Sequence, residues 1–310
     1  MKILVAVDLS QASQGGKDKK DSAAKQFDAD QLSRLQKLVG LKGSEVILLY
    51  VQEQLPSFEA VLSTQADFPD DLGHQVEKAA RGELDKLAEQ FKSAGAQVKV
   101  EVVHGPPAYM IEQVARDQGA HLMIVTAGNG AGERFLIGST SQHVIRHSPC
   151  SVLILRAPKG GEESKALNKI LVAVDGSDKC LQAVVSAVEN LNLEKSTLNI
   201  HIAHVVTLSP LVASFTPQSF VAALEENMIM EGEVALANAQ KVFVDRGFKS
   251  VDIEVAHGNS AGEIIKMAEK TGAGLIVIGS QGKGAVKHFL MGHVANRIVT
   301  HASAPTVVAR

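Results

Sequence analysis

The chain repeats itself at the scale of a whole domain. The run KILVAVD at 2–8 recurs with the same letters at 169–175. Later landmarks keep their order in both copies: His104-Gly105 with His257-Gly258, and Gly138 with Gly292. A repeat of about 150 residues is too long for a solenoid unit and has the size of a domain. We therefore predict two copies of one domain, residues 1–157 and 169–310, joined by a linker at 158–168.

Short runs rich in Val and Ile alternate with helical patterns in each copy. In the second copy we expect strands at 169–175, 198–206, 250–256, 274–279 and 305–309, and helices at 178–191, 217–246, 260–271 and from 292. Strands that alternate with helices through short connections form a parallel sheet with helices on both faces. The predicted fold class is α/β: two tandem Rossmann-like domains, each a doubly wound, five-stranded parallel sheet.

Apolar stripes on the longest predicted helices are typical of core faces. Both are spaced at steps of three, four or seven: Val76, Ala80, Leu84, Leu87 and Phe91 in the first copy, and Phe220, Leu224, Met228, Ala235, Ala239 and Val242 in the second. We expect both stripes to pack against their sheets.

The closing runs of the two copies, 152–155 and 306–309, are apolar enough to pair as strands. Such pairing would cover two sheet edges that are otherwise open to aggregation. We expect the two domains to pair with each other about a pseudo-two-fold axis, and a homodimer is left open.

Ligands of doubly wound sheets bind beyond the carboxyl ends of the strands, where the winding direction reverses. Asp8 and Asp175 stand there, directly after the first strand of each copy. The alternative is that they only end strands and cap turns, which Asp does well. The first copy then inserts a polar stretch at 10–28, which we expect to be a mobile lid over the site.

The second copy has a glycine loop after its fourth strand. Gly279 and Gly282 are followed, after nine further residues, by Gly292 at the start of a helix. Glycines allow the backbone to approach a ligand closely, and free N–H groups at a helix start attract an anion. The three glycines could equally serve turns alone.

With these motifs the chain resembles the universal stress protein family in its tandem two-domain form. The resemblance is carried by the VAVD strand ends, by HGPPA at 104–108, by LIVIGS at 275–280 and by the closing run RHSPCSVLILR at 146–156. It implies that, as in the ATP-binding members, the first-strand Asp contacts adenine and the glycine loop wraps the phosphates. In those members the last Gly is followed by Ser and, two residues later, by Ser or Thr; many other members bind no nucleotide.

The two copies depart from this motif in opposite ways. The first has both hydroxyls at its helix start, but its loop is one residue shorter and Thr126 stands where the first Gly is expected. Its candidate residues for binding an adenine nucleotide are Asp8, Val51, Gly128, Gly138, Ser139, Thr140 and Ser141. The second keeps the glycines but has His293 and Ala295 in place of the hydroxyls. Its candidates are Asp175, Val205, Gly279, Gly282, Gly292 and His293.

We favour the first copy as the site of ATP or another adenine nucleotide. The hydroxyls of Ser139 and Ser141 can donate to phosphate oxygens, whereas His293 adds bulk where phosphate must approach. Two points oppose this ranking: His293 can itself donate to phosphate, and Lys283, Lys287 and His288 add positive charge nearby. Ser139 and Ser141 could also be simple N-cap residues.

Other candidate groups are weak. His143 and His147 are four apart on a helix, but no third ligand is evident, so we predict no metal site. His201 and His204, three apart in a strand, should face opposite sides of the sheet. His104 and His257, which occupy equivalent positions in the two copies, are expected to have structural roles. Cys150 and Cys180 lack metal-like spacing, so we expect both to be small buried hydrophobic residues.

Charge and hydropathy exclude several classes of protein. The formal net charge is -3, and the one cluster of lysines, at 17–20, is mixed with Asp18 and followed by Asp21. Nucleic-acid binders need clustered positive charge, so we expect no nucleic-acid partner. No run reaches the roughly 18 apolar residues of a membrane span, and no secretory leader is evident. We therefore expect no membrane partner and a cytoplasmic location.

Catalysis has little support in the sequence. The P-loop pattern is absent, the segment at 128–133 fails the dinucleotide pattern, and no nucleophile-base arrangement is readable. We predict a regulatory stress-response module that binds an adenine nucleotide in at least one domain. The alternatives are a nucleotide-free module that acts through protein contacts and a slow ATP hydrolase.

Overall fold

The computed structural model describes residues 1–9, 29–53, 72–126, 137–156, 166–209, 214–282 and 291–310. The first half contains β1 (Lys2–Ala6), α1 (Ala29–Leu38), β2 (Glu45–Gln52), α3 (Leu72–Ser93), β3 (Gln97–His104), α4 (Pro107–Asp117), β4 (Leu122–Thr126), α5 (Ser139–His147) and β5 (Ser151–Leu155). The insert at 10–28, expected to be a lid, lies outside these described residues.

The second half repeats the same order. It contains β6 (Ala166–Ala173), α6 (Asp178–Glu189), the short 3-10 helix η2 (Lys195–Thr197), β7 (Asn199–Val206), α8 (Gln218–Asp245), β8 (Ser250–His257), α9 (Ser260–Thr271), β9 (Ala273–Gly279), α10 (His293–His301) and β10 (Thr306–Ala309). β6 begins at Ala166, so three residues of the segment predicted as linker belong to a strand.

Each half forms the doubly wound sheet that the alternation of strands and helices predicts. The strand order is β3-β2-β1-β4-β5 in the first half and β8-β7-β6-β9-β10 in the second, with parallel pairing throughout each set. The winding direction reverses between β1 and β4 and between β6 and β9. The predicted α/β class with two five-stranded parallel sheets is confirmed.

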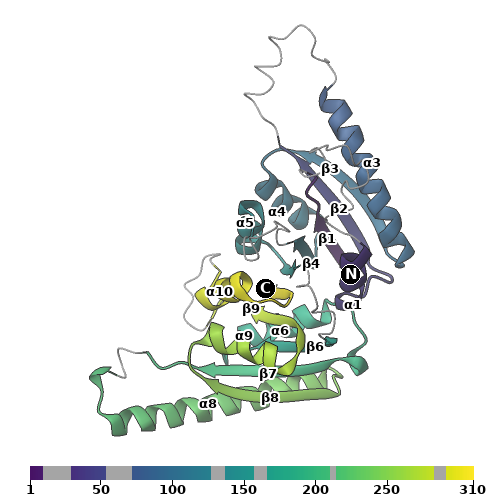
Figure 1. Cartoon of the computed structure of the whole chain (residues 1–310). Coiled ribbons are helices and arrows are strands. Elements are labelled where there is room, and N and C mark those ends of the chain that lie inside the picture. Colours follow the sequence, from purple (N-terminus) through teal and green to yellow (C-terminus); the bar gives the residue numbers. More distant parts are fainter. Residues whose placement is uncertain (10–28, 54–71, 127–136, 157–165, 210–213, 283–290) are drawn as a thin grey trace.

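The two sheets are joined edge to edge. β5 pairs antiparallel with β10, with Leu153 opposite Val307, so the described strands form one ten-stranded sheet (Figure 1). The closing runs of the two halves are therefore neighbours, and neither leaves an open edge at this position. This pairing buries backbone N–H and C=O groups that an edge strand would expose.

Helices cover both faces of the sheet. On one face, α1, α3, α6 and α8 pack over a hydrophobic core that runs from the first half into the second. On the other face α4 and α5 cover the first half, and α9 and α10 cover the second. Val299 of α10 and Val308 of β10 belong to the first-half core on that face, so both faces carry apolar contacts across the junction.

More of the apolar residues predicted to face the sheet are buried in α3 than in α8. In α3, Ala80, Leu84, Leu87 and Phe91 are buried, while Val76 near the helix start is exposed. In α8, Ala239 is buried but Phe220 is 61% exposed, so the expectation that Phe220 packs in the core was wrong. The reason is geometric: Phe220 lies on the same side of α8 as the exposed Met230 and Val234, and the N-terminal half of α8 extends past the ends of β7 and β8 (Figure 1).

None of the described helices combines the length and the apolar character that a membrane crossing requires. Cys150 and Cys180 are both buried and unpaired, in agreement with their predicted role as small hydrophobic residues.

Candidate functional site

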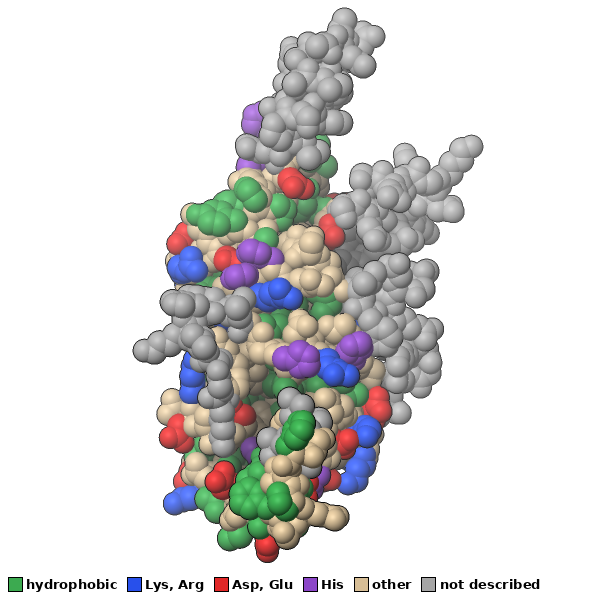
Figure 2. Space-filling view, turned by 90° about the vertical axis from the view of Figure 1, so that its left-hand side faces the viewer, with side chains coloured by type: hydrophobic (Ala, Val, Ile, Leu, Met, Phe, Trp, Pro, Cys, Tyr) green, Lys and Arg blue, Asp and Glu red, His purple; other side chains and the backbone are tan. Residues whose placement is uncertain are grey.

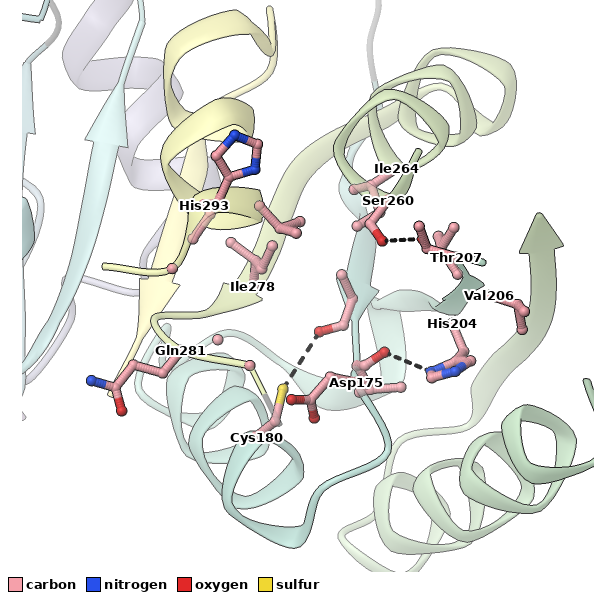
Figure 3. Close-up of a pocket in the computed structure, with 18 of the residues that line it drawn as sticks. Asp175, Cys180, His204, Val206, Thr207, Ser260, Ile264, Ile278, Gln281 and His293 are labelled. Atoms are coloured by element: carbon pink, nitrogen blue, oxygen red, sulfur yellow. Dashed lines mark hydrogen bonds between the residues drawn. The ribbon is translucent and has the colours of Figure 1, made fainter. Parts of the chain in front are cut away.

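A cavity of about 520 Å³ opens at the carboxyl ends of β6, β7 and β9 in the second half (Figure 3). It lies beside the point where the winding direction reverses, where doubly wound sheets bind ligands. All six second-half residues that we selected from the sequence line it: Asp175, Val205, Gly279, Gly282, Gly292 and His293. Its size falls within the range of small-molecule pockets, about 300–1,000 Å³.

Asp175 accepts hydrogen bonds from Ser177 through one of its carboxylate oxygens, and the Cys180 thiol interacts with the same carboxylate. Oδ1 accepts hydrogen bonds from the backbone N and from Oγ of Ser177, at 2.9 and 2.7 Å. Ser177 in turn caps α6, because its Oγ accepts from the backbone N of Cys180. Oδ2 is buried and has no hydrogen-bond partner among the described residues. Turn capping therefore accounts for the hydrogen bonds of Oδ1 alone.

The glycines keep the cavity open around this carboxylate. A side chain at Gly282 would place its Cβ 3.7 Å from Asp175 Oδ2, and one at Gly279 would press on the Cys180 sulfur at 3.0 Å. The backbone N of Gly292 donates to Ser280 O at 2.7 Å, which ties the start of α10 to the glycine loop. Of these glycines, Gly279 is the one whose surroundings are too tight for a Cβ, because the nearest contacts at Gly282 and Gly292 would be ordinary ones of 3.7 and 3.5 Å.

The start of α10 faces the same cavity. Gly292 is the N-cap residue and has no side chain to satisfy the first N–H groups of the helix. His293, the first residue of the helix, is exposed and lies across the cavity from Asp175 (Figure 3). A helix N-terminus of this kind attracts negative charge through its free N–H groups and its dipole.

His204 lines the cavity although the sequence did not single it out as a site residue. Its Nδ1 lies 3.0 Å from the carbonyl oxygen of Val174, the residue before Asp175. Because a carbonyl can only accept, Nδ1 carries the hydrogen, and Nε2 of the neutral ring is an acceptor. Gly232 of α8 leaves room for the ring, since a Cβ there would lie 2.8 Å from it. The signal was available in its position one residue before Val205, near the end of β7.

Cys180 also lines the cavity, and its thiol is expected to be unreactive. Burial, with the negative charge of Asp175 as a second cause, raises the pKa of Cys180 to about 11. The thiol therefore stays protonated near neutral pH and is a poor nucleophile. A covalent reaction at this position is not favoured.

The first-half candidates occupy the equivalent places. Asp8 is exposed just after β1, and Val51 is half-buried near the end of β2. Gly138 is the N-cap residue of α5, followed by the exposed Ser139 and by the half-buried Thr140 and Ser141. Gly128 lies outside the described residues, so this set stays a prediction.

Two histidines outside the cavity, His143 and His201, lie beside carboxylates. Nε2 of His143 lies 3.1 Å from Glu112 Oε1, and its ring stacks on that of His147. His201 lies against Glu254 at 3.1 Å, on the side of the sheet opposite to the contact that His204 makes with Val174. His257 is exposed at the end of β8 and is not among the residues that line the cavity.

Comparison with known proteins agrees with this architecture. The model of the universal stress protein family matches residues 1–156 and again 166–310. A universal stress protein of Bacillus subtilis is 33% identical over 147 residues, which cover 46% of this chain and 99% of that protein. One of Mycobacterium tuberculosis is 25% identical over 227 residues, 73% of this chain and 74% of that protein.

The solved structures show the same fold over the whole length. A universal stress protein from Archaeoglobus fulgidus has a TM-score of 0.65 at 19% sequence identity, covering 100% of this chain and 98% of that chain. Both halves of the sequence match the family model, and both halves of the structure have the same strand order. The chain therefore belongs to the universal stress protein family and carries two of its domains in tandem.

Proposed function

We propose that this protein binds an adenine nucleotide in the second-half cavity and that occupancy of the cavity regulates a stress response in the cytoplasm. The observation that carries the proposal is the buried Oδ2 of Asp175, which has no hydrogen-bond partner among the described residues and lies beside a cavity of about 520 Å³. A buried carboxylate oxygen without a donor costs free energy, which a ligand N–H would recover.

The chemistry near Asp175 suits the base of the nucleotide. The exocyclic amine of adenine can donate to Oδ2, which accepts only. The aliphatic side chains of Val205 and Ile278 supply apolar walls for a planar ring. These contacts suit an adenine ring.

The chemistry at the start of α10 suits the phosphates. The first N–H groups of this helix, the backbone at Gly282 and the His293 ring can all donate toward an anion. Glu231 of α8 lines the same cavity and disfavours additional negative charge. The order of affinity for ATP, ADP and AMP therefore depends on two opposing effects: the start of α10 attracts phosphate, and Glu231 repels it.

The first half is a second candidate site. It is supported by Asp8 after β1 and by Ser139 and Ser141 at the start of α5. Ser139 and Ser141 can each donate a charge-assisted hydrogen bond to phosphate. At the equivalent positions of the second half, His293 can donate one and Ala295 none. The described cavity favours the second half, and the hydroxyls favour the first.

Release of bound small molecules is the first test. Mass spectrometry of the supernatant after denaturation should detect an adenine nucleotide in the purified protein, and calorimetric titration should then give binding of ATP, AMP and adenosine. Asp175→Asn, which replaces one carboxylate oxygen by an amide, should weaken adenosine binding at least tenfold, while the matched Asp8→Asn leaves it unchanged. Loss only in the Asp8 variant would move the site to the first half.

The same titrations separate the two alternatives. A chain that binds neither ATP, AMP nor adenosine would act through protein contacts alone. Steady phosphate release from ATP, abolished together with binding in the Asp175→Asn variant, would instead identify a slow hydrolase.

A further inference from the structure

Helix α8 has apolar residues on two opposite faces. The inner face, which packs on β7 and β8, contains the buried Gly232, Leu236, Ala239 and Phe243. The outer face contains large apolar side chains that are exposed: Phe220 at 61%, Met230 at 58%, Val234 at 71% and Val244 at 52%. A helix that is apolar on both sides is ordinarily covered on both sides.

The exposed residues follow a heptad spacing. Steps of alternately three and four residues connect the positions of this outer seam: Phe220, Ala223, Asn227, Met230, Val234, Ala237, Lys241 and Val244. All eight side chains are exposed. Such spacing places the residues in one line along the helix, as in the seam of a coiled coil, where an isolated Asn such as Asn227 sets the register. Hydrophobic side chains gather at the lower end of the molecule in Figure 2, where α8 lies in Figure 1.

The first half offers an internal control. Helix α3 occupies the equivalent place, but its surface is polar and carries ion pairs between Glu77 and Arg81 and between Glu89 and Lys92. Val76 is the one large apolar side chain exposed in the described part of α3, at 37%. Because the same fold forms under α3 without an apolar outer face, folding does not require the outer seam of α8.

The charges beside the outer seam have one sign. Residues 218–234 contain four glutamates, Glu225, Glu226, Glu231 and Glu233, and neither Lys nor Arg. Glu226 and Glu233 are exposed along one edge of the seam, at the positions where paired helices exchange ion pairs. Two copies of α8 would bring these carboxylates together, and like charges disfavour such pairing. A helix with basic flanks would meet them favourably.

We infer that the outer seam of α8 docks an amphipathic helix of a partner protein, with apolar residues at heptad spacing and Lys or Arg beside them. This inference is independent of nucleotide binding, because the seam faces away from the sheet. The apolar residues would supply most of the affinity, and the glutamates would select the partner by charge.

A synthetic helix tests the inference directly. The probe is a fluorescent peptide of about four heptads with Leu and Ile in its seam and Lys at the flanking positions, and its partner in the assay is the full chain. Fluorescence anisotropy should show binding that weakens as salt rises. A peptide with Glu in place of every flanking Lys should bind at least tenfold more weakly.

Variants locate the contact. Met230→Gln with Val234→Gln should weaken binding of the Lys-flanked peptide at least tenfold, and Glu226→Gln with Glu233→Gln should weaken it several-fold and flatten its salt dependence. Val76→Gln on α3 is the matched control and should leave binding unchanged. These positions are exposed, so circular dichroism and the unfolding midpoint should match those of the unmodified chain.

Three results would overturn the inference. One is that the unmodified chain does not bind the Lys-flanked peptide, or that the Met230/Val234 variant binds it as tightly as the unmodified chain does. Another is equal binding of the Lys-flanked and Glu-flanked peptides. The last is a concentration-dependent dimer in sedimentation that the Met230/Val234 variant abolishes, because a second copy would then cover the seam.

Discussion

Arg156 and Arg310 make the same contact in opposite directions across the junction of the two halves. Each follows a closing strand, and each guanidinium donates to carbonyl groups at the C-terminus of a helix in the other half. Arg310 donates from Nη2 to the carbonyls of Ile145 and Arg146, both at 2.6 Å, and Arg156 donates to that of Val299. A cation at a helix C-terminus is stabilised by the helix dipole and by the unpaired carbonyls. Burial lowers the pKa of both arginines, which is the cost of placing them there.

Loss of either arginine should destabilise the junction. We expect Arg310→Ala and Arg156→Ala each to lower the free energy of unfolding by roughly 1.5–3 kcal/mol, because hydrogen bonds from a charged donor are lost. Urea unfolding followed by circular dichroism measures this. Arg146→Ala, at an exposed position on α5, is the control, and an equal loss there would contradict the assignment.

Two glycines should respond in opposite directions to the same substitution. The backbone N of Gly40 donates to Leu191 O across the junction, and a Cβ at Gly40 would lie 2.0 Å from Asn192 O. Gly40→Ala should therefore cost roughly 1–3 kcal/mol or more. Gly82→Ala, in α3 with open space around the added Cβ, should stabilise by about 0.5–1 kcal/mol. Thermal unfolding of the two variants would refute this if both shifted the same way.

Cys180 should make stability depend on alkaline pH. Its pKa rises from 9.0 to about 11 in the folded chain, so folding favours the neutral thiol. This contribution is fully present below pH 9 and is lost as the pH rises from about 9 to 11. It corresponds to roughly 2–3 kcal/mol. The difference in unfolding free energy between the unmodified chain and Cys180→Ala should shrink over that interval; a difference independent of pH would show that the thiol is not shifted.

Substitutions at the start of α5 and at the start of α10 should have different effects on the affinity for ATP. If Ser139 and Ser141 hold phosphate, changing both to Ala weakens ATP binding by roughly 2–5 kcal/mol and costs the fold only about 1–2 kcal/mol. Under the second-half proposal ATP affinity stays the same in this variant and falls in Gly292→Val, which places a branched side chain at the start of α10. Calorimetry with ATP and with adenosine distinguishes the two outcomes, because a phosphate contact affects ATP alone.

Much of this architecture could be predicted from local patterns in the chain. The duplication is visible in the repeated KILVAVD run, and the alternation of Val- and Ile-rich runs with helical periods predicts two parallel sheets. The position of Asp175 after a first strand, and the spacing from Gly279 to Gly292, bring the predicted second-half residues to one cavity. These features can be predicted because periodicity and strand ends depend on residues that are close together in the sequence.

Other features depend on which distant residues become neighbours. The stripe predicted on α8 has helical spacing, but Phe220 lies on the exposed side of the helix and Phe243 on the side that is buried against the sheet. Sequence patterns also could not distinguish the two oxygens of Asp175: Oδ1 accepts from Ser177, and Oδ2 has no hydrogen-bond partner in the described part of the chain.

The chain by itself thus determined the repeated fold and the sheet edge at which a ligand would bind, because both follow from short-range periodicity and strand order. Only the tertiary structure decided how the halves join, which side of α8 stays uncovered and that Arg156 and Arg310 cross between the halves. Those outcomes depend on register and packing between segments more than a hundred residues apart, such as β5 and β10, and no local pattern specifies them.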